Sequence, residues 1–69
     1  MFFTVLEIQV GNNGVKRCIP VIYDNENDAV AKFFTICSVA AVSDLPYHAA
    51  FVLDDNGMMV KSEIFDRRA

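Results

Sequence analysis

The sequence is poor in the residue types that build most catalytic and metal sites. It contains no tryptophan, a single histidine and two cysteines among 69 residues. A catalytic triad or a metal centre sets His or Cys beside further polar groups, and His48, Cys18 and Cys37 have no such neighbours in the sequence. We therefore expect no catalytic residue, no metal and no cofactor, and we interpret both cysteines as reduced packing residues.

Positive charge is also scarce. Six Lys and Arg stand against nine Asp and Glu, which gives a formal net charge of −3. The basic residues are scattered along the chain rather than gathered in a stripe. Because binding to a phosphate backbone depends on clustered Lys and Arg, nucleic acid is not an expected partner.

Long hydrophobic runs are absent as well. No stretch approaches the ~20 apolar residues that a membrane-spanning helix needs. The first residues carry no basic side chain, and Glu7 interrupts their apolar run, so we expect no signal peptide. These patterns predict a soluble, cytoplasmic protein that does not associate with a membrane.

Apolar side chains are what this short chain has in excess. Hydrophobic residues make up 54% of it and charged residues 22%. The length leaves room for one domain, expected to span 1–69, and a domain this small buries only about 60% of the surface of its unfolded chain. One copy therefore carries more apolar surface than it can cover. We expect a homo-oligomer, and a two-fold dimer is the commonest form.

Two stretches of alternating apolar and polar residues predict a first hairpin. The alternation covers about 2–10 and 15–23, which is the period of half-buried strands. The Gly-Asn-Asn-Gly segment at 11–14 tolerates the positive φ angles of a tight turn. Pro20 cannot donate to a strand ladder, so the second strand is predicted to lie at an edge or to carry a bulge.

The next segment predicts the only helix. Residues 24–28 offer several N-caps and place negative charge at the positive end of the helix dipole. Residues 43–46, Ser-Asp-Leu-Pro, end the pattern, so the helix is expected over about 26–42. Apolar residues at three-and-four spacing predict a buried stripe of Val30, Phe33, Phe34, Cys37, Ala40 and Ala41.

A second hairpin closes the chain. Strands are expected over about 49–53 and 58–65, with the Asp-Asp-Asn-Gly turn at 54–57 between them. Residues 67–69 are interpreted as a short solvated tail. The predicted fold is therefore α+β with the order ββαββ, in which two β-hairpins form a mainly antiparallel four-stranded sheet and one helix packs on one face. The order of the strands is left open.

Two surfaces are candidates for the expected self-association. One is the sheet face that the helix leaves uncovered, with residues from sets such as Phe3 and Val5 or Cys18 and Ile22. The other is the back of the helix, which carries no charge between residues 33 and 42. The interface residues that we predict lie on the helix, and they are Phe34, Ile36, Val39 and Val42.

Few side chains are suited to contact a ligand or a partner. His48 stands at the expected entry to the third strand, and we interpret it mainly as a boundary residue whose ring packs and whose nitrogen meets backbone or water. A small nucleotide would need basic and aromatic groups converging in a cleft between subunits. The candidate contacts for such a ligand or a partner are Lys16, Arg17, Tyr47 and His48.

Two segments carry a resemblance to a known group of proteins. They are Val-Leu-Glu-Ile-Gln at 5–9 and Ala-Ala-Val-Ser-Asp-Leu-Pro-Tyr-His-Ala-Ala at 40–50. With them, nearly the whole chain resembles small proteins of unassigned function encoded by tailed bacteriophages and prophages of gut Firmicutes. The resemblance implies a virus-associated protein of the host cell cytoplasm, and it transfers no catalytic or binding residue.

Two functional hypotheses follow. The first is a non-enzymatic, phage-associated interaction protein that acts through a protein surface as a homo-oligomer, with an unidentified phage or host protein as its partner. The alternative is an inhibitor of a bacterial anti-phage defence system. Such an inhibitor would block a nuclease or sequester a nucleotide signal between its subunits.

Overall fold

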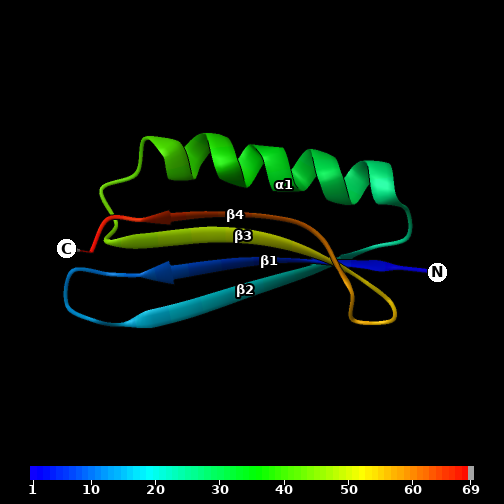
Figure 1. Ribbon diagram of the computed structural model, residues 1–69, viewed down its shortest axis with the longest axis horizontal. Coiled ribbons are helices and arrows are strands. Elements are labelled where there is room, and N and C mark those ends of the chain that lie inside the picture. The colour runs from blue at the N-terminus through cyan, green and yellow to red at the C-terminus, as the bar shows by residue number, and fades with distance from the viewer. Residues whose placement is uncertain (69) are drawn as a thin grey trace.

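The computed structural model describes residues 1–68 as one antiparallel sheet and one helix (Figure 1). The elements in chain order are β1 (Phe3–Val10), β2 (Lys16–Tyr23), α1 (Glu26–Ala41), β3 (Tyr47–Asp54) and β4 (Met59–Asp66). The strands form a four-stranded sheet of order β2-β1-β3-β4, and each neighbouring pair is antiparallel. The α+β fold with ββαββ order that the sequence predicts is confirmed.

The sheet joins the two hairpins through their inner strands. β1 pairs with β3 along its whole length, so β2 and β4 form the two edges. Pro20 therefore lies on an edge strand, where its missing N–H leaves no ladder bond unmade, as the sequence predicts. The β3–β4 pairing shifts its register between Val52 and Leu53, which marks a bulge beside the second turn.

Side chains close in sequence stabilise the start of α1 and the turn between β3 and β4. Asn25 caps α1, because its Oδ1 accepts a hydrogen bond from the Asp28 N–H at 2.9 Å. In the second turn, Asp54 Oδ1 accepts from the Asn56 and Met58 N–H groups, each at 2.9 Å, and Gly57 adopts a φ of 81°. The predicted cap segment and turn are thus found where the sequence places them.

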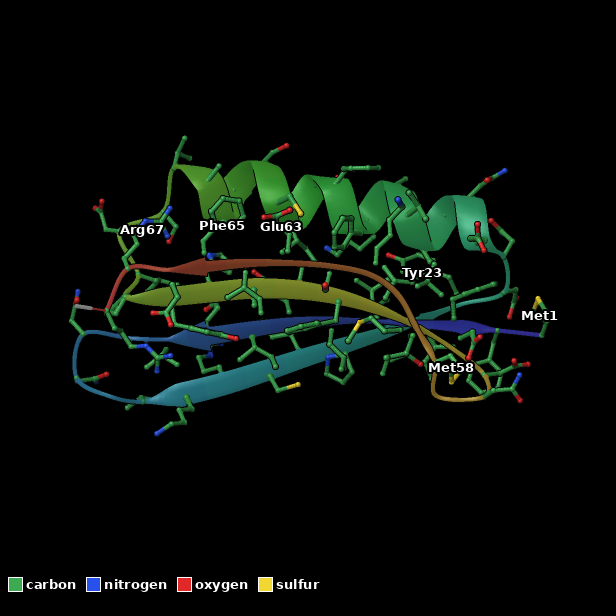
Figure 2. The ribbon with its side chains drawn as sticks, viewed as in Figure 1. Met1, Tyr23, Met58, Glu63, Phe65 and Arg67 are labelled. Carbon is green, nitrogen blue, oxygen red and sulfur yellow. The ribbon has the colours of Figure 1, made fainter. Side chains whose placement is uncertain are left out.

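The end of α1 is held by a residue from the far end of the chain. The last turn of the helix contains no basic residue, but Arg67 Nη2 donates to Ala40 O at 2.8 Å and to Ala41 O at 3.2 Å (Figure 2). A cation there donates hydrogen bonds to carbonyl groups that have no partner within the helix, and its charge is attracted to the negative end of the helix dipole. Arg67 is therefore a helix cap and not part of a solvated tail, which corrects that prediction; Ala69 lies outside the described residues.

The core lies between α1 and the two inner strands. On the sheet side it contains Phe3, Val5, Ala50 and Val52, and on the helix side Ala29, Phe33 and Ile36. The stripe of α1 that is fully buried is Ala29, Phe33, Ile36 and Ala40. Of the predicted stripe, Phe33 and Ala40 are buried and Val30 and Cys37 are half-buried, but Phe34 and Ala41 are exposed, so the prediction was wrong for those two residues. Apolar residues surround this helix, so their spacing admitted more than one phase.

β3 begins two residues earlier than the sequence predicts. Tyr47 pairs with Val10 and His48 pairs with Gln9, so both belong to the sheet rather than to the loop after Pro46. β3 extends this far because, without it, the backbone N–H and C=O groups at the end of β1 would have no hydrogen-bond partners on the side away from β2.

Candidate functional site

The face of the sheet opposite α1 is the most distinctive surface of the molecule. The helix lies along one side of the sheet, and no described element lies on the other side (Figure 1). Side chains alternate between the two faces, so the strand register defines which residues form the open face. Read from β2 to β4, its rows are Lys16, Val10, Tyr47 and Asp66; Cys18, Ile8, Ala49 and Ile64; Pro20, Leu6, Phe51 and Ser62; and Ile22, Thr4, Leu53 and Met59.

This open face is almost wholly apolar. Apart from Ser62, the two central rows contain only apolar side chains. Its edge residues are well exposed, with 65% exposure at Ile22 and 50% at Ile64. At about 3.3 Å per residue and about 4.8 Å per strand, the face measures about 26 Å by about 19 Å. The whole face therefore covers several hundred Å², and apolar side chains from all four strands lie next to one another in its central rows.

Charge occurs on the open face only at one end. Lys16 stands on the β2 edge and Asp66 on the β4 edge of the same row. Arg68 binds Asp66 through Nε–Oδ1 at 2.9 Å and Nη2–Oδ2 at 3.0 Å, and its guanidinium carbon lies 4.7 Å from the centre of the Tyr47 ring. The hydrogen bonds from Arg68 lower the pKa of Asp66 below its ordinary value.

The structure decides which strand residues are uncovered. Cys18 and Ile22 belong to the open face, as one predicted set has it. Phe3 and Val5, the other set, are buried beneath α1 at 5% and 0% exposure, which corrects the prediction for them. The odd-numbered side of β1 faces the helix because Phe3 and Val5 pack with the helix stripe around Phe33.

The predicted interface residues of the helix do not form one surface. Ile36 is buried in the core at 4% exposure, so its assignment to the helix back was wrong. Phe34, Val39 and Val42 are exposed. Phe34 and Val39 are five residues apart and so point about 140° apart around the helix axis. Phe34 lies on the flank near β4, where the ammonium of Lys61 is 5.8 Å from its ring centre.

Polar residues of the inner strands turn toward the helix and pair there. His48 is 1% exposed, and its Nε2 lies 2.6 Å from Glu7 Oε2, which also accepts from Gln9 Nε2 at 2.9 Å. Burial opposes ionisation of Glu7, but the hydrogen bonds from His48 and Gln9 outweigh it, and the pKa of Glu7 lies below its ordinary value. An ionised carboxylate only accepts, so Nε2 of His48 carries the hydrogen.

This pair corrects the interpretation of His48 as a boundary residue meeting backbone or water. The ring is inside β3, and its Nδ1 is buried without a hydrogen-bond partner among the described residues. Sequence reasoning missed the pair because Glu7 and His48 are 41 residues apart and become neighbours only through the β1–β3 pairing. The Glu7–His48 contact is thus a buried link between the two hairpins.

The four predicted ligand contacts do not converge in one chain. Lys16 and Tyr47 lie on the open face with Val10 between them. Arg17 and His48 lie in one row on the helix side, where β4 also turns Glu63 and Phe65 toward α1 (Figure 2), and His48 is buried. A hollow of about 270 Å³ on that side is lined by Gln9, Gly11, Asn13, Val15, Arg17 and Leu45, so Arg17 alone of the four reaches it.

The remaining findings concern the whole described chain. Residues 1–68 contain no group of three or more His, Cys, Asp or Glu side chains arranged to hold a metal ion. Within the same residues, no helix combines the length and apolar character needed to cross a membrane. Comparisons with protein-family models, with curated proteins and with solved structures gave no match.

Proposed function

We propose that this protein is a non-enzymatic interaction protein that works as a homo-oligomer, and that the open face of the sheet is its self-association surface. The observation that carries the proposal is the pair of central rows on this face, which join apolar residues of all four strands without a charge. A surface of this kind marks a site where a protein binds another macromolecule.

The size of the open face supports self-association. Its dimensions correspond to about 500 Å² for each copy and about 1,000 Å² when two copies meet, which is the area from which specific interfaces begin. The whole chain exposes 4399 Å², so the face is about a tenth of its surface. Burying it also supplies the apolar contacts that a chain of this length lacks in a monomer.

The setting that we propose is viral. The segments 5–9 and 40–50 resemble those of the small phage and prophage proteins, which supports a role in phage particle assembly or infection. When the open face is used for self-association, the exposed apolar residues of the helix stay free. We assign a phage or host protein partner to the end of the helix around Val39 and Val42, which lie on a different side of the helix axis from Phe34.

Sequestration of a nucleotide is not part of this proposal. A ligand that contacted both Lys16 and Arg17 would have to reach around the β2 edge, because consecutive strand residues point to opposite faces. His48 is engaged with Glu7 and covered by the helix layer. The separated positions therefore favour a protein surface over a nucleotide site.

A matched pair of variants tests the surface that we assign to self-association. Ile22→Lys places a charge on the open face, where Ile22 is 65% exposed, and Val39→Lys places one on the helix, where Val39 is 55% exposed. Both positions tolerate Lys in a monomer, since edge strands and helix surfaces accept it. We expect light scattering to show a lower mass for Ile22→Lys only. A lower mass for Val39→Lys with an unchanged mass for Ile22→Lys would refute the assignment.

A further inference from the structure

The open face is asymmetric in its charge. Lys16 occupies one corner and Asp66 the other corner of the same end. The corners of the opposite end are held by Ile22 and Met59, which are apolar. Any second copy that covers this face must therefore bring something to the charged end that matches a cation at one edge and a carboxylate at the other.

Two-fold symmetry limits the ways in which two such faces meet. In a face-to-face dimer the symmetry axis lies in the plane between the sheets, and the same patch contributes from both copies. If the axis runs along the strands, the β2 edge of each copy lies over the β4 edge of the other, and the charged end of one copy lies over the charged end of the other. Lys16 of each copy then lies over Asp66 of the other. This arrangement pairs opposite charges twice.

The other orientations leave Lys16 without a partner. If the axis runs across the strands, the ends exchange, and Lys16 lies over Ile22 of the second copy while Asp66, paired only with Arg68 of its own chain, lies over Met59. A charge set against apolar side chains loses hydration without gaining a partner. If the axis runs diagonally, one charged corner meets the same corner of the second copy. Like charges then face each other.

We propose that two copies of this chain pack open face against open face with the two-fold axis along the strands, so that β2 of each copy covers β4 of the other. This inference rests on the proposed self-association. The sheets then pack in the aligned manner, about 10 Å apart and inclined by about 30°. Asp66 can serve both Arg68 and Lys16 of the second copy, because a carboxylate has about four acceptor positions.

Thiol cross-linking tests the orientation directly. Cys18 and Ile64 hold opposite edges of one row, so this dimer sets Cys18 of one copy over Ile64 of the other. Facing positions of sheets about 10 Å apart are too distant for a direct disulfide, so we would treat Ile64→Cys in a Cys37→Ser background with a short bismaleimide and expect a covalently linked dimer on a denaturing gel. The two thiols of one chain are about 14 Å apart across three strand spacings, which is beyond the reach of a short cross-linker.

The control variant reports the competing orientation. Pro20→Cys in a Cys18→Ser, Cys37→Ser background is mixed with the Cys37→Ser chain, so that the thiols at positions 20 and 18 are carried by different copies and cannot react within one chain. An axis across the strands sets these two positions over each other in different copies. We expect no linked dimer from this mixture. Linkage through Pro20→Cys without linkage through Ile64→Cys would overturn the proposed orientation.

Charge exchange provides a second, independent test. Lys16→Glu and Asp66→Lys each place like charges together twice in the dimer, and we expect each to raise the dissociation constant about tenfold. The double variant restores opposite charges across the interface, so we expect its dissociation constant to return toward that of the original chain. Circular dichroism of each variant checks that the fold is retained. If a charge variant fails to fold, the thiol cross-linking experiment decides the orientation.

The outcomes separate the orientation from the self-association beneath it. Linkage through Ile64→Cys together with rescue by the double charge variant establishes the orientation. A dimer that shows neither linkage nor rescue overturns the orientation but leaves the proposed function standing. A folded monomer of the unmodified chain at micromolar concentration overturns both.

Discussion

The buried contact between Glu7 and His48 gives the sharpest prediction about stability. Replacing Glu7 with Leu removes the acceptor of His48 Nε2, which lies 2.6 Å away. The His48 side chain is 2% exposed and that of Glu7 is 15% exposed, so water cannot replace the lost partner at the ring. The Nδ1 atom already has no partner among the described residues, and the variant leaves the second ring nitrogen buried and unpaired as well.

The size of the effect follows from these contacts. A buried polar atom left without its partner costs about 1–3 kcal/mol, and a bond to a charged group contributes about 1.5–3 kcal/mol. Because Glu7 is partly exposed, we expect Glu7→Leu to lower the free energy of unfolding by about 2–3 kcal/mol. The double variant Glu7→Leu with His48→Leu removes both polar groups, and we expect it to recover most of that loss.

The pair also predicts a pH dependence. The pKa of Glu7 is lower in the folded chain than its ordinary value, so its contribution is fully present above that ordinary value. The contribution is lost as pH falls through the lowered pKa of the folded state. We therefore expect the stability difference between the original chain and Glu7→Leu to shrink on acidification below about pH 4.5.

Urea unfolding followed by circular dichroism measures these quantities. All variants need one fixed protein concentration, because self-association contributes to apparent stability. Gln9→Leu serves as a matched control, since Gln9 donates to the same Glu7 oxygen but lies beside the pair, and we expect it to cost under about 1 kcal/mol. A loss below about 0.5 kcal/mol for Glu7→Leu, or a double variant less stable than both single ones, would show that the two residues do not act as a unit.

Three further predictions concern the cap, the turn and a cysteine. We expect Arg67→Ala to lower the free energy of unfolding by about 1–2 kcal/mol, because two hydrogen bonds to the end of α1 are lost, whereas Arg68→Ala has a smaller effect because its ion pair with Asp66 is exposed to water. Equal losses in urea unfolding would contradict this. We expect Gly57→Ala to cost about 1 kcal/mol in the same assay, because φ at Gly57 is 81°, and no loss would contradict the turn geometry. Cys37→Ser should leave the mass in light scattering unchanged, since Cys37 packs against the core rather than the open face, and a changed mass would contradict that placement.

Local signals were sufficient to predict the elements of this fold. The alternation of β1 and β2, the Asn25 cap and the glycine of the second turn each act within a few residues, so their effect is written in adjacent positions. Pro20 predicts an edge strand or a bulge for its segment, and β2 is an edge strand. The phase of the helix stripe was less determined, because apolar residues occur on every side of α1 and only packing against the sheet selects Ile36 over Phe34.

The candidate surface depended on contacts that are remote in sequence. Leu6 and Ile8 alternate with Glu7, a pattern typical of a strand with its polar side in water, yet here the polar side faces the helix. Phe3 and Val5 set this orientation by packing beneath the helix, and His48 supplies the buried partner of Glu7 once β3 has paired with β1. Phe51 and Leu53 of β3 likewise place apolar side chains on one face of their strand. The sequence of a single strand, however, does not show which of its faces the helix will cover.

The mass of the unmodified chain in solution tests the central claim most directly. One copy has a mass of 7.7 kDa. Light scattering at micromolar concentration should give twice that mass, because burial of the open sheet face in a two-fold dimer is what we propose holds two copies together. A folded protein with the mass of a single copy at that concentration would contradict the account.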